Sequence, residues 1–589
     1  MITALHKIRL SMAKQKIDYL IVPHGDEFNN EYLPAYNERL ARASGFTGSF
    51  GLAVIGMTHA HLFTDGRYVL QCQDELDIDV WDVHLWASEN PYQWLANHVE
   101  KSKRVAMDPW THSHREANLI EASATKVGAE ILYLSASIID ATWNSRPVPL
   151  TTKAAIHGLE FAGVSTAEKI DRLSLQIKRD GVDAVVLTQA DSICWLLNIR
   201  GREIPYNPLV LSYAILYADG KLDWFVSPDK TTDKVVKVMP DTVTVHLDTD
   251  FEAGLRSLTD KAVGLDSSSV PHAIAMMLED AGAKVRTYKD PCAFDKACKN
   301  STEIQGTHAA HLRDGVALVK FLHWLDAEAP KETLTEIAAA DKLEALRAEN
   351  DSFKGLSFPT ISGVGPNGAV VHYKVDASSN RPLKKNDIYL VDSGAQYLDG
   401  TTDITRTIFL GDVCEDPEIK DRYTRVLKGH IALGAARFPV STTGGALDSL
   451  ARQFLWQIGE DYAHGTGHGV GSYLCVHEAP QRISKKGADA PLKPGMILSN
   501  EPGFYKEDFY GIRLENLVLV TESDQEGWLK FEQLTWAPFD KRLIEQSLLT
   551  SDEIDWIDAY HAEVKEKLAG HLKEDQRAWL DAATRSLLT

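Results

Sequence analysis

Cysteine is scarce in this chain of 589 residues. The six that occur are scattered and follow no framework spacing: Cys72, Cys194, Cys292, Cys298, Cys414 and Cys475. This pattern argues against a disulfide-stapled secreted domain and favours reduced thiols in a cytosol. We therefore expect a cytoplasmic protein.

Long apolar runs and an excess of positive charge are also missing. Residues 1–17 form an amphipathic, lysine-rich stretch without a continuous apolar core or a small-residue cleavage site. Neither a signal peptide nor a transmembrane segment is predicted from such a stretch. The formal net charge is -21, which disfavours binding to nucleic acid or to an anionic membrane surface.

The composition is that of an ordinary globular protein, with 44% hydrophobic and 25% charged residues. A chain of this length is expected to hold about two to four domains, each large enough to bury a core. The first half also contains a faint internal repeat. Apolar residues at helical spacing precede a buried strand at 17–22, and the same order recurs before a strand at 182–187. A hairpin is expected to follow in each copy, with turns at 64–66 and 218–220, so we infer two successive α/β domains of one type.

The predicted domain bounds follow from clusters of prolines and polar residues and from helix-capping signals. Prolines and polar residues cluster at the start of 145–163, which favours a boundary there. A helix capped near Ser301 or Thr302 opens the last domain, and Thr550 to Glu553 resembles a capping box for a late helix whose role is packing or subunit contact. We therefore expect domains at 1–157, 158–299 and 300–589, the last ending in a helical extension at about 541–589.

Two aspartates lie in a predicted hairpin near residue 400. The segment 389–410 contains two β-rich runs joined by a turn around Asp399 and Gly400. Asp392 and Asp403 would face each other directly only with a bulge, because the turn signal lies about two residues too late for direct opposition. Taken alone, either aspartate would be a solvated hairpin residue.

A glycine-rich segment carries histidines. It reads HGTGHGVG from His464, with His468 four residues later, and His477 follows nine residues further on. The glycines exclude a zinc-binding helix of the HExxH kind and imply close approach of the backbone to something bound. A lone histidine is more often a structural residue, but this cluster favours a site.

Two further carboxylates lie in short motifs. Glu501 precedes a proline in NEPG, and the run 511–520 is predicted as one strand with Arg513 and Glu515 on the same face. Four buried carboxylates would repel one another, by about 4 kcal/mol for a pair ~4 Å apart, unless cations neutralised them. Oxygen ligands with one imidazole suit Mn²⁺, Co²⁺ or Zn²⁺, so a two-metal hydrolase site is predicted from Asp392, Asp403, His468, Glu501 and Glu515.

The order and spacing of these motifs resemble the pita-bread metallopeptidases, and specifically the three-domain aminopeptidases P, which are Xaa-Pro aminopeptidases. The resemblance is close over roughly 300–540 and includes the upstream His372. It implies two creatinase-like α/β domains followed by a pita-bread catalytic domain. It also implies a homodimer, with short peptides carrying proline at the second position as substrates.

The resemblance also implies roles for the site residues. Asp392 would chelate one metal, His468 and Glu501 the other, and Asp403 and Glu515 would bridge both; the metals are expected to be Mn²⁺, with Zn²⁺ or Co²⁺ as alternatives. Glu501 would shuttle a proton for a metal-bridging hydroxide, while His372 and His477 would bind the substrate and stabilise the intermediate. His464 would line the prolyl pocket and Arg513 would support the metal carboxylates. Phe358 stands where some shorter relatives carry a tyrosine, and its side chain has no hydroxyl to donate to Asp392.

Four alternatives share parts of this pattern. Prolidases, which cut only dipeptides and are usually two-domain proteins, are the nearest competitor. Methionine aminopeptidases resemble only the last domain, and creatinases lack the ligand set. From a different class, metal-free pita-bread domains act as binding modules, against which the complete ligand set argues.

Overall fold

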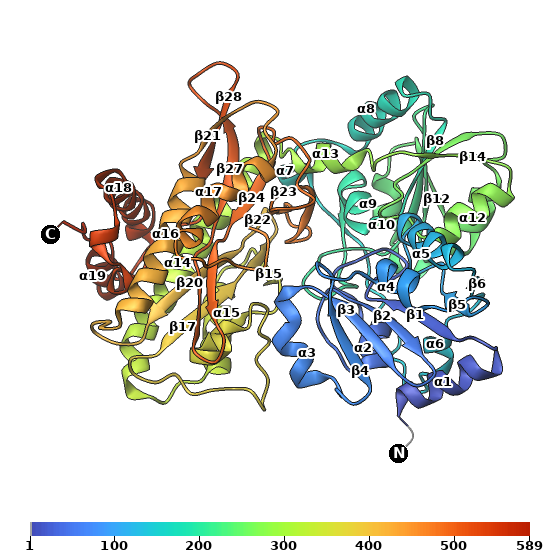
Figure 1. Ribbon diagram of the computed structural model, residues 1–589. Helices are drawn as coiled ribbons and strands as arrows, with labels where there is room; N and C mark the ends of the chain where they lie inside the picture. Colours follow the sequence, from blue (N-terminus) through green and yellow to red (C-terminus); the bar gives the residue numbers. More distant parts are fainter. Residues whose placement is uncertain (1–2, 589) are drawn as a thin grey trace. The chain divides into compact units, whose positions relative to one another are not determined.

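The computed structural model describes residues 3–588, which fall into two compact units. The first unit comprises the residues up to 159 together with 164–293, and the second comprises 160–163 and the residues from 294 on. Each unit is α/β in character (Figure 1). The predicted bounds 1–157, 158–299 and 300–589 stay predictions.

The first sheet of the first unit has the order β4-β3-β2-β1-β5-β6. The central strand β1 pairs antiparallel with β2 and parallel with β5. Its residues Leu20, Ile21 and Val22 are buried because helices cover both faces of the sheet. The strands are β1 (Tyr19–Pro23), β2 (Leu52–Gly56), β3 (Ala60–Thr64), β4 (Trp81–Leu85), β5 (Arg104–Met107) and β6 (Glu130–Tyr133). The helices are α1 (Ala4–Lys14), α2 (Arg39–Ser44), α3 (Val69–Glu75), α4 (Pro91–His98), α5 (His114–Lys126) and α6 (Ile138–Thr142).

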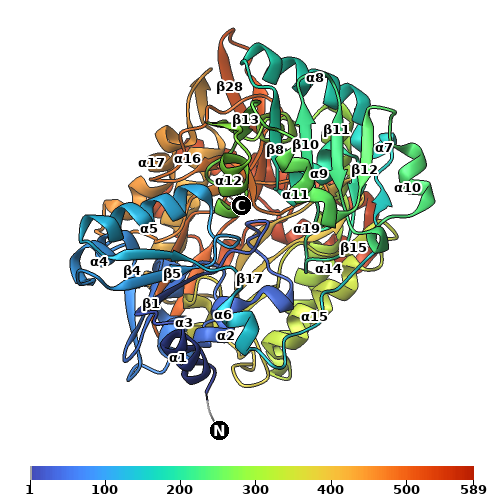
Figure 2. The same cartoon turned by 90° about the vertical axis from the view of Figure 1, so that its right-hand side faces the viewer.

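The second sheet repeats this topology, with the order β12-β11-β10-β8-β13-β14 (Figure 2). Here β8 takes the place of β1 and pairs antiparallel with β10 and parallel with β13. The predicted pair of α/β domains of one type is therefore confirmed. The strands are β8 (Ala184–Leu187), β10 (Tyr213–Tyr217), β11 (Leu222–Phe225), β12 (Val243–His246), β13 (Ala262–Leu265) and β14 (Lys284–Thr287). The helices are α8 (Thr166–Arg179), α9 (Ala190–Leu196), α10 (Asp233–Val238), α11 (Phe251–Arg256), α12 (His272–Asp280) and, at the start of the second unit, α13 (Cys292–Ala297).

One of the two predicted hairpin turns is confirmed and the other is wrong. The turn at 218–220 joins β10 to β11, as the sequence indicated. The hairpin turn predicted at 64–66 is wrong, because β2 and β3 are joined at 57–59 and β3 ends at Thr64. The Thr-Asp-Gly sequence instead starts a short 3₁₀ helix, in which Asp65 accepts a hydrogen bond from the backbone N–H of Arg67.

The second unit is built on several small sheets packed against helices. The largest has the order β21-β28-β27-β24-β22-β23, in which β21 is Arg437–Pro439, and a second contains β16-β17-β20. The strands that concern the site are β16 (Ile361–Val364), β17 (Ile388–Ser393), β18 (Ala395–Tyr397), β19 (Gly400–Thr401), β20 (Ile404–Phe409), β22 (Gly467–Gly469), β23 (Glu478–Ile483), β24 (Ile497–Asn500), β25 (Gly503–Lys506), β26 (Tyr510–Arg513), β27 (Asn516–Glu522) and β28 (Trp528–Gln533).

Helices surround these sheets, and their termini match the sequence signals. Asn300 caps α14 one residue before the predicted position, and the capping box at Thr550 opens α18 as predicted. The C-terminal helices α18 and α19 pack against α14, and α18 also packs against α16 (Figure 1). The helices are α14 (Ser301–Glu328), α15 (Glu336–Arg347), α16 (Pro417–Gly434), α17 (Gly444–Trp456), α18 (Ser551–Leu568) and α19 (Glu574–Ala583).

The register of the predicted hairpin differs from direct opposition of its aspartates. Asp392 lies opposite Thr405, because Tyr397 pairs with Gly400 and the turn is centred between Leu398 and Asp399. Asp403 lies in the break between β19 and β20, two residues before Thr405. The two aspartates are thus offset along the hairpin.

The predicted single strand at 511–520 is also wrong. It is divided into β26 and β27, which belong to different sheets, and Glu515 lies in the bend between them. Its backbone N–H donates to the carbonyl of Thr405, which ties this bend to β20. Within residues 3–588 no helix is both long and apolar enough to span a membrane.

Candidate metal centre

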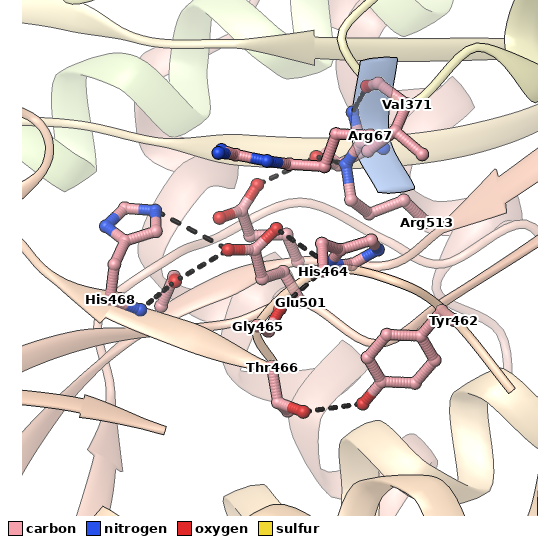
Figure 3. Close-up of polar contacts among 12 residues, drawn as sticks. Arg67, Val371, Tyr462, His464, Gly465, Thr466, His468, Glu501 and Arg513 are labelled. Atoms are coloured by element: carbon pink, nitrogen blue, oxygen red, sulfur yellow. Dashed lines mark hydrogen bonds and ion pairs between the residues drawn. The ribbon is translucent and has the colours of Figure 1, made fainter. Parts of the chain in front are cut away.

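Three predicted ligands converge so closely that they could hold one ion. Ligand atoms of Asp403, His468 and Glu515 all lie within 4.8 Å of one another. The carboxylate of Glu501 joins them, since its Oε1 lies 3.6 Å from the Nε2 of His468 (Figure 3). Asp403 directly precedes β20, His468 lies in β22, Glu501 directly follows β24, and Glu515 lies in the bend before β27. The fold therefore brings together segments far apart in sequence.

His468 is oriented as metal-binding histidines usually are. Its Nδ1 lies 3.0 Å from the carbonyl oxygen of Gly469, which can only accept, so Nδ1 carries the proton. The lone pair of Nε2 then points toward Asp403, whose Oδ2 is 3.4 Å away. A hydrogen bond from the second ring nitrogen to a backbone carbonyl is the usual way of fixing a histidine ligand.

Glu501 is held from two sides. Its backbone N–H donates to the carbonyl of Thr466, which links β24 to the glycine-rich segment before β22. The hydroxyl of Ser499 donates to Glu501 Oε1 over 3.2 Å and also accepts from the backbone N–H of His468 over 2.9 Å. One serine therefore couples the positions of two predicted ligands.

Asp392 is paired with Arg513, as predicted for a supporting arginine. The guanidinium donates to Asp392 Oδ2 over 2.7 Å, and both side chains are buried. The other oxygen, Oδ1, is buried and has no hydrogen-bond partner. A buried carboxylate oxygen without a donor is costly unless a cation binds it, so Oδ1 fits a metal ligand.

The carboxylate of Glu515 accepts a hydrogen bond from a hydroxyl and faces the other carboxylates. The hydroxyl of Thr405 donates to its Oε2 over 2.7 Å, and the side chain is only 1% exposed. Thr405 also accepts from Arg513 Nε over 3.2 Å, so it lies between the arginine and the glutamate. Thr405 was not singled out from the sequence.

Each carboxylate of this cluster makes ionisation of its neighbours less favourable. The pKa of Asp403 is raised well above its usual range, first by burial and then by the charges of Asp392 and Glu501. Burial together with the charges of Asp403 and Glu501 likewise raises the pKa of Glu515 well above normal. Burial also raises the pKa of Glu501. Divalent cations would relieve this repulsion, and four carboxylates with one imidazole are a donor set suited to them.

The predicted substrate-binding histidines lie around this cluster. The ring of His477 is 4.3 Å from that of His468, centroid to centroid. Nδ1 of His464 lies 3.9 Å from Glu501 Oε2 (Figure 3). His372 follows Val371, whose carbonyl accepts from Arg513 over 3.3 Å. The structure thus brings His464 and His477 to the cluster, and it places His372 beside the residue bonded to Arg513.

Tyr505 is a site residue that the sequence interpretation missed. Its hydroxyl accepts from Arg513 over 2.6 Å and lies 2.8 Å from His464 Nε2. It therefore connects the arginine that holds Asp392 to a predicted pocket residue. Phe358 is buried and offers no hydroxyl, so the polar contact to Asp392 comes from Arg513 instead. The NEPGFY sequence places Tyr505 four residues after Glu501, which was the available signal.

Metal-free protein is expected to become less stable as pH rises. The folded-state pKa values of Asp403 and Glu515 are raised, so their stabilising contribution is complete below about pH 4, where the unfolded groups titrate, and is lost as pH rises through the raised values. Mn²⁺ should restore the loss, and more so at higher pH. Thermal unfolding from about pH 5 to pH 8, with and without Mn²⁺, measures this effect. The slope should be shallower in Asp403→Asn; an equal slope in that variant would show that another group is responsible.

Comparison with known protein families identifies the class of protein to which this chain belongs. Residues 305–522 match metallopeptidase family M24, and residues 527–587 match the C-terminal region of that family. Residues 5–138 and 145–303 each match a creatinase/prolidase N-terminal domain. The fold and the carboxylate-rich centre therefore define a metallopeptidase of family M24 with two creatinase-type domains.

Full-length relatives narrow this class. Aminopeptidase P1 of Arabidopsis thaliana is 38% identical over 98% of both chains. A probable Xaa-Pro aminopeptidase P of Paracoccidioides brasiliensis is 39% identical over 99% of this chain and 98% of its own. The chain belongs to the aminopeptidase P family, whose members are named Xaa-Pro aminopeptidases.

Solved structures agree with this placement. The X-prolyl aminopeptidase of Caenorhabditis elegans, described as a cytosolic enzyme with a di-nuclear active site, superposes with a TM-score of 0.94 at 34% identity and covers 99% of both chains. An Xaa-Pro dipeptidase from Bacillus anthracis matches 64% of this chain and 99% of its own, with a TM-score of 0.53 at 22% identity. The second likeness concerns the fold alone.

Proposed function

We propose that this protein is a dinuclear-metal aminopeptidase that releases the N-terminal residue from peptides with proline in the second position. The observation that carries the proposal is the convergence of Asp403, His468, Glu501 and Glu515 beside a buried Asp392 oxygen that has no donor. The full-length likeness to proteins named Xaa-Pro aminopeptidases supports the substrate class.

A prolidase, which would cut only dipeptides, is less well supported. The Bacillus anthracis dipeptidase is matched along nearly its whole length by only 64% of this chain. The Caenorhabditis elegans aminopeptidase, in contrast, is matched over 99% of its length by 99% of this chain. The complete ligand set argues against a metal-free binding module.

The geometry supports distinct metal-binding roles for the ligands. Asp392 has one free oxygen and would bind one ion, while His468 and Glu501 lie together and would bind the other. Asp403 and Glu515 are the most buried of the four candidate carboxylate ligands and lie close to each other, as bridging ligands must. Two cations held there would acidify a water molecule and polarise the scissile carbonyl.

The remaining steps belong to the chain's own groups. The prolyl nitrogen leaves only after gaining a proton, and Glu501, whose pKa is raised by burial, is the carboxyl group that can carry one to it. His477 and His372 would donate hydrogen bonds to the substrate carbonyl as negative charge develops there. His464, fixed by Tyr505, would line the pocket for the pyrrolidine ring. Arg513 holds the Asp392 side chain in place.

Finer features of the proposal follow from ligand chemistry and from the family. Mn²⁺ is the favoured metal because the donor set is rich in oxygen. A cytoplasmic location, a homodimeric assembly and a preference for short peptides complete the proposal. The Caenorhabditis elegans relative, described as cytosolic, supports the location.

Substrate specificity tests the proposed function. With Mn²⁺ present, Xaa-Pro-Yaa tripeptides should be cut at the first bond, Xaa-Ala-Yaa peptides far more slowly, and N-acetylated Xaa-Pro-Yaa hardly at all. A free amine is needed to reach the metals or a carboxylate, and the pocket must fit the proline ring. Rates on these peptides and on the Xaa-Pro dipeptide are compared under one condition. Cleavage of the dipeptide alone would favour a prolidase, and equal rates on the proline and alanine tripeptides would contradict proline specificity.

A further inference from the structure

A buried histidine outside the ligand set touches both glutamate-bearing segments. His430 lies on α16, is 0% exposed, and is bound through one ring nitrogen to two carbonyls. Its Nδ1 is 3.1 Å from the carbonyl oxygen of Asn500 and 3.2 Å from that of Leu514. These are the residues directly before Glu501 and Glu515. A single N–H group of His430 is thus within hydrogen-bond distance of both segments.

The ring of His430 is neutral and fixed in one tautomer. Both partners of Nδ1 are carbonyls, so that nitrogen must carry the proton, and Nε2 is buried without a hydrogen-bond partner. Burial, with a smaller contribution from Arg406, lowers the pKa of His430 to about 3. The contact is reinforced in the other direction, because Asn500 Nδ2 donates to the carbonyl of His430 over 2.9 Å.

A buried arginine, Arg406, binds the segment that contains Glu515. Arg406 NH1 donates to the carbonyl of Glu515 itself over 2.7 Å, and NH2 donates to the side chain of Asn516 over 2.8 Å. NH2 also lies 3.1 Å from the hydroxyl of Tyr560, on the C-terminal helix α18. Tyr560 stacks on Trp556, whose ring in turn meets the edge of His430. Helix α18 therefore contacts both groups that hold the ligand segments.

We propose that His430, Arg406 and Tyr560 are positioning residues that fix the spacing of Glu501 and Glu515, and that helix α18 is therefore part of the scaffold of the metal centre. The inference rests on the proposed function, because it concerns how that centre is held. A metal pair tolerates only small displacements of its ligands, on the order of 0.5 Å. His430 binds the carbonyl of the residue that precedes each glutamate, and Arg406 binds the carbonyl of Glu515 itself.

Direct binding of Mn²⁺ to the metal-free full-length protein tests the proposal. The variants are His430→Leu, which removes the shared N–H, His430→Asn, which retains an N–H donor near its position, and Tyr560→Phe. Isothermal titration gives the Mn²⁺ affinity, and electron paramagnetic resonance shows whether two bound ions are coupled. His430→Leu should bind Mn²⁺ about 10–100-fold more weakly, as is usual when a group behind the ligands is lost. Tyr560→Phe should show a smaller weakening, and His430→Asn should recover much of the affinity.

Tyr423→Phe is the matched control. Tyr423 is equally buried on α16, and its hydroxyl accepts from the backbone N–H of Asp540 rather than from a ligand segment. It should lower the melting temperature without changing Mn²⁺ affinity. Wild-type affinity and coupling in both Tyr560→Phe and His430→Leu would overturn the proposal, and Tyr560→Phe alone decides it if His430→Leu does not fold. A wild-type protein that binds no Mn²⁺ would overturn the proposed function itself.

Discussion

Glu515→Ala should lower turnover of an Xaa-Pro-Yaa peptide by at least about 1000-fold, at a free Mn²⁺ concentration that just saturates the wild type. Glu515 is buried beside Asp403 and His468, and it is the proposed bridge between the two ions. Its loss should remove the shared ligand and leave at most one ion bound. Turnover and metal content per chain are measured on the same preparation.

Glu522→Ala serves as the control for that result. Glu522 ends β27, the strand that directly follows Glu515, but it is exposed and lies outside the cluster. Its replacement should leave both turnover and metal content unchanged. Undiminished turnover of Glu515→Ala at the limiting Mn²⁺ concentration would show that Glu515 is not a ligand.

The histidines should separate into two functional kinds. His468→Ala is expected to lose bound metal as well as turnover, because its Nε2 points at Asp403 and Glu501. His477→Ala should keep both ions and lose turnover by about 10²–10³-fold, the usual effect of removing one donor to a developing oxyanion. His372→Ala is expected to behave like His477→Ala.

Metal content by mass spectrometry, beside steady-state kinetics, distinguishes these outcomes. His308→Ala is a suitable control, since His308 is half-exposed on α14 and pairs with Glu532 rather than with the cluster. Loss of an ion from His477→Ala would mean that His477 belongs to the ligand set. Retention of both ions by His468→Ala would remove His468 from it.

Much of the site could be predicted because its ligands lie in short motifs of distinctive composition. The glycines around His468 and the proline after Glu501 mark positions where ordinary helix or strand packing does not explain the residue. The repeated α/β domains were predictable for a similar reason, because the helix-then-strand pattern recurs at one offset. Both sheets have the same strand order.

Register and long-range contacts could not be predicted. The Asp399-Gly400 signal identifies a turn, but a shift of one residue in its centre decides whether Asp392 faces Asp403 or Thr405. The alternation around Glu515 likewise gave no sign of the bend that divides β26 from β27. His430 and Arg406 act through partners far away in the chain, and no local pattern distinguishes them from core residues.

Stepwise addition of Mn²⁺ to metal-free protein tests the two-metal claim most directly. The protein is freed of metal, titrated with Mn²⁺, and followed by Xaa-Pro-Yaa hydrolysis and by electron paramagnetic resonance in the same samples. Two ions per chain should bind, activity should be absent from the metal-free protein, and the spectrum should report a coupled pair when activity is complete, because the carboxylates of Asp403 and Glu515 lie close enough to be shared. Full activity in the metal-free protein, or a single uncoupled ion at full activity, would contradict the account.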